Sequence, residues 1–248
     1  MQTKTQKDWF ESILGQSLLG CEQSIYDHAV SDVFGFYAVQ VGLPQIDCLK
    51  SSRIPHVITA GKAIGHIHCE SDYLPFAESS IDLLCMPHAL EFSDNPYQTL
   101  REAARVLVPE GYLIMTGFNP FSFWGLKRLL KKKAGYPWGG QFFSLLRIKD
   151  WLALLGMEFV ESEFFCHELP VNNEAWLKRF SFASKIGAKW WPMLGGQYVI
   201  VAKKCVVNIA LLEPKWTQRV LKPGLAVSGQ KTRIKRAINK IKLKVSNK

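Results

Sequence analysis

The sequence of 248 residues contains no run of about 18 apolar residues, the length that a helix needs to cross a bilayer. Its start lacks a basic segment followed by an apolar core and a small-residue cleavage site, so we expect no secretory signal. The six cysteines are scattered without a Cys-x-x-Cys pair, which favours reduced thiols in a cytoplasmic protein. The histidines and carboxylates show no metal-ligand spacing, so no metal site is expected.

Acidic residues are nearly absent from the last fifth of the chain. Residues 203–248 contain 13 Lys or Arg and one acid, Glu213, a charge of +12. Because the whole chain has 31 basic and 21 acidic residues, residues 1–202 hold 18 and 20, a charge of −2. Apolar residues recur at helical spacing within 231–244, so a basic amphipathic helix and a disordered arm both remain open. Such a tail binds nucleic-acid phosphates or an anionic membrane surface, unless it only solubilises the protein.

A strand–helix–strand unit occupies Leu74 to Pro120. The apolar run Ile81 to Met86 suits a strand that is buried on both faces of a parallel sheet. Asp94-Asn95-Pro96 supplies an N-cap and a first-turn proline, which predicts that a helix starts there. Pro109-Glu110-Gly111 is expected to stop this helix, and Tyr112 to Thr116 to form the next strand. The order predicts a right-handed crossover.

Four motifs within this stretch occur in a fixed order. They read Leu-Pro-Phe before the strand, His-Ala-Leu-Glu-Phe after it, Leu-Arg-Glu-Ala-Ala-Arg-Val-Leu-Val-Pro-Glu-Gly in the helix, and Gly-Phe-Asn-Pro closing the second strand. Together they resemble the class I S-adenosylmethionine-dependent methyltransferases, the type 11 branch in particular, over about residues 70–120. The resemblance implies an α/β Rossmann-like sheet of seven mostly parallel strands, with an antiparallel last strand and helices on both faces. It also implies S-adenosyl-L-methionine as cofactor.

The resemblance and the charge distribution predict a division of the chain into three parts. Residues 1–30 are expected to be an N-terminal helical cap, 31–204 a methyltransferase-like domain, and 205–248 a basic tail. Within the domain the remaining strands are expected at 34–43, 56–59, 64–69, 157–165 and 197–202, with helices at 47–52 and 147–155.

The resemblance places the cofactor beyond the carboxyl ends of the first, third and fourth strands. The residues it implies for cofactor binding are Val41, Gly42, Leu43, Glu70, Ser71, Asp72, Pro87 and His88. Two departures from the family pattern stand out. The first turn has a single glycine, Gly42, followed by Pro44, and the second strand ends in Ala60-Gly61-Lys62 without the acid that commonly binds the ribose.

Two residues after the fourth strand are candidates for a catalytic base. His88 could contact the methionine moiety or accept a proton, or it could cap the following turn. Glu91 could line the substrate side, or it could be an ordinary carboxylate at a helix N-terminus.

Residues 118–143 are both aromatic and basic. They follow the carboxyl end of the fifth strand, which favours a lid over a flat or anionic acceptor, with Asn119, Phe121 and Trp124 lining the substrate site. The alternative is an amphipathic helix docked on the body with a solvated lysine face. Residues 169–194 are expected to be a helical insertion that adds aromatic wall.

Three functions remain after this reading. The first is methyl transfer to an unidentified acceptor, which we expect to be a small molecule. The second is a methyltransferase-fold protein without catalysis that binds RNA or another anionic partner. A nicotinamide-dependent enzyme ranks last, because no Gly-x-Gly-x-x-Gly is present. The sequence carries no sign of an oligomeric state.

Overall fold

The structure is a computed structural model, and it describes residues 2–62, 65–130, 135–168, 170 and 192–205. Contacts between Cα atoms divide the chain into residues 1–207 and 208–248. The second unit, which holds most of the expected basic tail, lies outside the described residues, as does most of the expected insertion 169–194.

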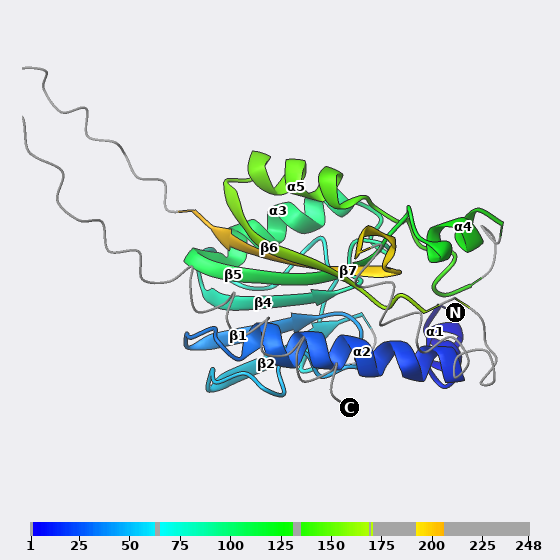
Figure 1. The fold of residues 1–248 in the computed structure, drawn as a ribbon. Coiled ribbons are helices and arrows are strands. Elements are labelled where there is room, and N and C mark those ends of the chain that lie inside the picture. Colours follow the sequence, from blue (N-terminus) through cyan, green and yellow to red (C-terminus); the bar gives the residue numbers. More distant parts are fainter. Residues whose placement is uncertain (1, 63–64, 131–134, 169, 171–191, 206–248) are drawn as a thin grey trace, which may run out of the picture. The chain divides into compact units, whose positions relative to one another are not determined.

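One seven-stranded sheet organises the first unit, in the order β3-β2-β1-β4-β5-β7-β6 (Figure 1). Neighbouring strands from β3 to β5 are parallel, whereas β7 runs antiparallel to both β5 and β6. The strands are β1 (Tyr37–Val41), β2 (His56–Gly61), β3 (Ile67–His68), β4 (Ile81–Pro87), β5 (Leu107–Phe118), β6 (Met157–Phe165) and β7 (Gln197–Lys204). The predicted Rossmann-like methyltransferase sheet is therefore confirmed.

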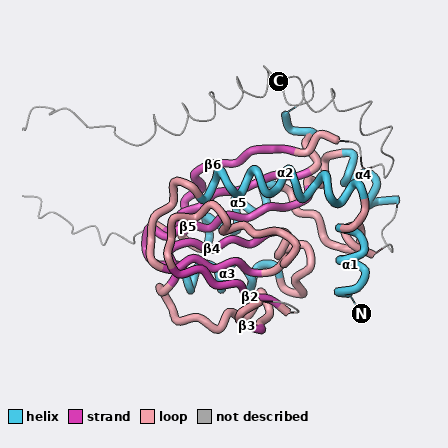
Figure 2. Tube along the Cα trace, turned by 90° about the horizontal axis from the view of Figure 1, so that it is seen from below, coloured by secondary structure: helices cyan, strands magenta, loops and turns pink. Residues whose placement is uncertain are grey.

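Helix α2 (Ile13–Val30) covers one face of this sheet. Its buried residues Leu14, Leu18, Glu22, Tyr26 and Val30 recur every four residues, which puts them on one side of the helix. The apolar members pack with Ala38 of β1, Cys85 of β4 and Ile114 of β5 in one core cluster. Figure 2, which looks onto this face, shows α2 running along the strands. The shorter α1 (Gln2–Phe10) precedes it, and its Trp9 contacts Trp124 and Tyr136 of the segment that follows β5.

Helices α3 (Pro96–Val106) and α5 (Leu145–Leu154) cover the opposite face (Figure 1). Asn95 caps α3 by accepting a hydrogen bond from the Gln98 N–H, and Pro96 fills its first turn, as predicted. The buried side chains of both helices pack on Val39, Leu84 and Met115 in the second core cluster. Three layers of helix, sheet and helix result.

Two expected element boundaries are wrong. No helix forms over residues 47–52, where successive turns lead from β1 to β2. Helix α3 ends at Val106, earlier than the predicted stop at Pro109, because Leu107 is already extended and pairs with Ile81 of β4. Strand β5 therefore runs through the Pro-Glu-Gly turn, with Glu110 at a φ of 67°.

Within residues 118–143, the short helix α4 (Phe123–Leu130) lies beyond the carboxyl ends of the parallel strands, and residues 135–143 lead back to the body (Figure 1). Trp124, Tyr136, Trp138 and Phe143 are buried. Trp124 stacks on Phe118 and Trp138 at ring-centroid distances of 5.6 and 5.5 Å. Much of the aromatic content of this segment thus belongs to the core.

Candidate functional site

The turn after β1 leaves open space on its outer side. Gly42 adopts a φ of 84°, which glycine tolerates best, and its N–H donates to the Ala60 carbonyl at 2.9 Å. A Cβ built on Gly42 would meet only the Pro87 carbonyl oxygen, at 3.8 Å. The backbone at Gly42 therefore has no side chain packed against it between the tips of β1 and β4.

A buried amide holds this turn in place of a glycine-rich sequence. Gln40 Nε2 donates to the carbonyls of Leu43 and Ile46 at 3.1 and 2.8 Å, and Gln40 Oε1 accepts the Cys48 N–H at 2.9 Å. Because these backbone groups bond to a side chain, they have no need of the helix that was expected after the turn. Sequence reasoning missed Gln40, although a glutamine inside an otherwise apolar strand was a visible signal.

Three further residues implied for cofactor binding, Glu70, Ser71 and Asp72, follow β3, which lies two strands from β1 in the sheet. Glu70 is exposed and forms an ion pair with Lys62 Nζ at 3.1 Å, while Ser71 and Asp72 are half-buried in the turn that follows. Lys62 occupies the position at the end of β2 where the family commonly has an acid. The Glu70 carboxylate therefore reaches toward the tip of β2, on the side where a ribose acid is missing.

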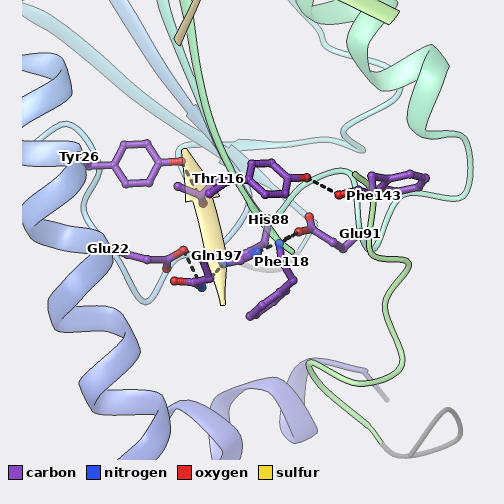
Figure 3. Close-up of polar contacts among 9 residues, drawn as sticks. Glu22, Tyr26, His88, Glu91, Thr116, Phe118, Phe143 and Gln197 are labelled. Carbon is purple, nitrogen blue, oxygen red and sulfur yellow. Dashed lines mark hydrogen bonds and ion pairs between the residues drawn. The ribbon is translucent and has the colours of Figure 1, made fainter. Parts of the chain in front are cut away.

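A buried polar cluster lies at the carboxyl end of β4 (Figure 3). His88 stands directly after the strand with a φ of 50° and is almost fully buried. Its Nε2 contacts Glu22 Oε1 at 2.6 Å and its Nδ1 contacts Glu91 Oε1 at 3.2 Å. Glu22 belongs to α2 and Glu91 to the loop after β4, so the two carboxyl groups hold the ring from opposite sides. Phe118 at the end of β5 stacks on the ring at 4.2 Å.

The two carboxyl groups decide the protonation of His88. Burial lowers the pKa of His88, but the charges and hydrogen bonds of Glu22 and Glu91 outweigh it and raise the pKa to about 10. Both ring nitrogens therefore donate a hydrogen bond at neutral pH. An imidazolium held in this way cannot accept a proton, so the geometry favours a carboxylate over His88 as a base.

Three acceptor atoms around this cluster have no hydrogen-bond partner among the described residues: Glu22 Oε2, Glu91 Oε2 and Gln197 Oε1. Glu91 uses its other oxygen twice, because Oε1 also accepts the Phe118 N–H at 2.7 Å. Gln197, the first residue of β7, donates from Nε2 to Glu22 Oε1 at 3.3 Å. Since unpaired buried acceptors are costly, this cluster suits a donor group supplied from outside the chain.

Sequence reasoning named His88 and Glu91 but missed Glu22 and Gln197. The signal for Glu22 was its place in the four-residue repeat of α2, where an acid interrupts an otherwise apolar stripe. Gln197 carried no comparable signal, because a polar residue at the start of a strand is ordinary.

The three expected substrate-lining residues lie in different surroundings. Asn119 is buried and donates from Nδ2 to the carbonyls of Met193 and Gly195 at 2.8 and 2.9 Å, so it ties the end of β5 to the approach of β7. Trp124 lies in the core and donates from Nε1 to the Glu168 carbonyl at 3.0 Å. Phe121 points outward and is exposed.

A pocket of about 500 Å³ opens beside the end of β5. Two guanidinium groups flank its aromatic floor: Arg128 lies 5.1 Å from the Phe142 ring centre, and Arg147 lies 5.9 Å from that of Phe143. Arg128 is fixed by donating from Nε to the Gly140 carbonyl at 2.6 Å. We call this the arginine pocket; its lining is Pro120, Arg128, Gln141, Phe142, Phe143, Ser144 and Arg147. None of the described residues that line it is acidic, so it suits a flat or anionic molecule.

Comparison with known proteins agrees with this geometry. A family model described as a methyltransferase domain matches residues 37–115. The uncharacterized protein YafS of Escherichia coli is 32% identical over 186 residues, which cover 72% of each chain. The chain belongs to the class I S-adenosylmethionine-dependent methyltransferases. Among the described residues of this methyltransferase, no group of three His, Cys, Asp or Glu side chains is placed to hold a metal ion.

Solved structures show the same fold as this methyltransferase at low identity. A possible histamine N-methyltransferase from Thermotoga maritima aligns with a TM-score of 0.51 at 19% identity, covering 80% of this chain and 93% of that one. A putative methyltransferase in complex with the Trm112 activator of Haloferax volcanii aligns with a TM-score of 0.53 at 15% identity, covering 74% and 89%. At these identities the likeness shows the fold alone.

Proposed function

We propose that the chain transfers a methyl group from S-adenosylmethionine to a small-molecule acceptor. The observation that carries this proposal is the open turn at Gly42, which faces the Pro87 carbonyl at the tips of β1 and β4, where open α/β sheets bind their ligands. Val41, Gly42 and Leu43 would hold the methionine end, and Glu70, Ser71 and Asp72 the adenine end.

When bound, S-adenosylmethionine supplies a methyl group that is activated by its positively charged sulfur. The chain's own task is to align the acceptor, exclude water and remove the acceptor's proton. We assign the proton to the unpaired Oε2 of Glu91, whose Oε1 is held by His88 Nδ1 and the Phe118 N–H. His88 then keeps both carboxyl groups in place rather than acting as the base.

The arginine pocket is our candidate for the acceptor site. It adjoins Pro120 at the exit of β5, and its floor of Phe142 and Phe143 below two guanidinium groups suits a flat molecule that carries negative charge. A pocket of this size holds a small molecule rather than a macromolecule. The absence of an acidic lining residue supports the same choice.

Calorimetry with S-adenosylmethionine and S-adenosylhomocysteine tests the cofactor site. We expect micromolar binding of at least one of them. Glu70→Gln should weaken that binding by about 1–3 kcal/mol if the carboxylate accepts a hydrogen bond from the adenine amino group. Glu78→Gln, at an exposed acid that no part of the site uses, is the matched control and should bind as the wild type does.

A second function has specific support. The chain has one glycine in the first turn and Lys62 where the family commonly has a ribose acid, so a scaffold that has lost methyl transfer and binds RNA or another anion is the alternative. No binding of either nucleoside in the calorimeter would favour it. In both cases the basic tail 205–248 is proposed to contact nucleic acid or an anionic membrane surface.

We place the protein in the cytoplasm, because all six cysteines are free thiols. Among the described residues, no helix is both long and apolar enough to cross a membrane.

A further inference from the structure

Helix α4 turns its apolar side away from the protein. Phe123, Leu126 and Leu130 follow one another at helical spacing and, with Leu129, form a single stripe. All four side chains are more than half exposed, with Leu129 at 66% and Leu130 at 81%. Phe121, just before the helix, is exposed as well. We call these five residues the α4 apolar face.

The basic residues of α4 bend toward the protein, with Lys127 at the flank of the apolar stripe and Arg128 on the opposite side. Lys127 Nζ donates to the Pro170 carbonyl and lies 4.9 Å from the Trp138 ring centre. Arg128 donates to the Gly140 carbonyl and lies over Phe142. A surface helix of a water-soluble protein normally shows the reverse, with its apolar side inward and its charges in solvent. The orientation of α4 is held by these contacts and by buried Trp124 between them.

The exposed leucines of α5 do not gather in this way. Leu146 and Leu154 of α5 are 71% and 76% exposed, yet they stand eight residues apart at the two ends of their helix. Single exposed apolar residues are normal on protein surfaces, whereas a contiguous apolar patch marks an interaction site.

We infer that the α4 apolar face inserts into the surface of an anionic phospholipid bilayer. Three lysines, Lys131 to Lys133, directly follow α4 in the sequence, whereas residues 1–202 as a whole carry a charge of −2. This local run of positive charge is complementary to anionic lipid headgroups, and it opposes the pairing of two copies of the chain through this face. Nucleic acid would match the charge, but it offers no apolar phase for five large side chains. An apolar stripe with nearby basic residues is the pattern of helices that lie in a bilayer interface.

Flotation of the full chain with vesicles tests this inference. The vesicles are phosphatidylcholine alone, or phosphatidylcholine with about a third phosphatidylglycerol. The test variant is Leu129→Ser with Leu130→Ser on α4; the matched control is Leu146→Ser with Leu154→Ser on α5, which removes the same side chains at similar exposure. Urea unfolding verifies that both variants are folded.

We expect the wild type to bind the anionic vesicles, the α4 variant to bind them at least about tenfold more weakly, and the α5 control to remain within about twofold. Repeating the comparison at about 0.5 M salt separates the tail, whose attraction is screened, from the α4 contribution, which persists. Equal binding of wild type and α4 variant at both salt concentrations, or no binding of the wild type, overturns the inference. A wild-type dimer that the α4 variant dissociates, with vesicle binding unchanged, would instead assign the face to a second copy.

Discussion

The cluster around His88 and the α4 apolar face both depart from the usual placement of residues: the first buries charged groups, and the second exposes apolar side chains. Under α2 the protein buries Glu22, His88 and Glu91, which would be well solvated at its surface. On α4 it exposes leucines and a phenylalanine that would be stable in its core. Both arrangements cost folding free energy, and neither is needed to complete the sheet. A protein retains such costs where a ligand or partner offsets them, so the two regions mark where function is expected.

The two regions differ in whether other groups of the chain offset the unfavourable placement. The buried charges pair with each other, because each ring nitrogen of His88 has a carboxylate oxygen within 3.2 Å. The exposed side chains of the α4 apolar face have no such internal match. The first region should therefore respond to mutation through stability, and the second through association.

Of the two regions, the buried cluster is expected to show the larger loss of stability when it is broken. Glu22→Gln keeps the shape of the side chain but removes the charge that pairs with His88 Nε2, so the free energy of unfolding should fall by about 3 kcal/mol. Urea denaturation measures it. Glu11→Gln, at an exposed acid just before α2, is the control and should change stability by less than about 0.5 kcal/mol. A loss for Glu22→Gln as small as that of the control would mean that the pair contributes nothing.

A pH titration of stability should show an intermediate effect. Because the folded-state pKa of His88 is raised to about 10, its stabilisation is complete below the ordinary histidine pKa near 6.5. It is lost as the pH rises from there through 10, with a slope of up to about 1.4 kcal/mol per pH unit. The measurement is the free energy of unfolding from pH 6 to 10, compared with His88→Asn, which lacks this slope. Parallel curves for the two proteins would contradict a charged His88.

The smallest effect on stability is expected on α4. Leu129→Ser with Leu130→Ser should change the free energy of unfolding by less than about 0.5 kcal/mol per residue, because both side chains are mostly exposed. Trp124→Ala in the same helix removes a fully buried ring and should cost about 3–5 kcal/mol. Thermal or urea unfolding compares them. A large loss for the leucine variant would show that the α4 apolar face supports the fold rather than a partner.

The fold was predictable because its signals are local. The apolar run Ile81 to Met86 and the Asn95-Pro96 cap each specify an element within a few residues, and β4 and α3 begin where these signals place them. The turns at 47–52 were not predictable in this way. Their backbone is held by Gln40 from a neighbouring strand, and a propensity argument contains no such contact.

The candidate site was predictable only where it follows the strands. Gly42 and His88 were named because the carboxyl ends of parallel strands meet at one edge. Glu22 pairs with His88 across 66 residues and accepts from Gln197 across 175, so this partnership is a property of the packed fold. The outward orientation of α4 was likewise invisible, because periodicity shows that a helix has two sides but not which side meets the protein.

The connection between β6 and β7 begins and ends at neighbouring points of the sheet. The Gly196 N–H donates to the Cys166 carbonyl at 2.9 Å, and Asn119 secures Met193 and Gly195 beside the same junction. A chain segment that is fastened at both ends in this manner can be lengthened, shortened or exchanged at little entropic cost to the remainder. We therefore expect changes of length between residues 170 and 192 to leave the stability of the sheet nearly unchanged. The junction at Gly196 and Asn119 makes this stretch the natural place to insert a foreign segment into the scaffold.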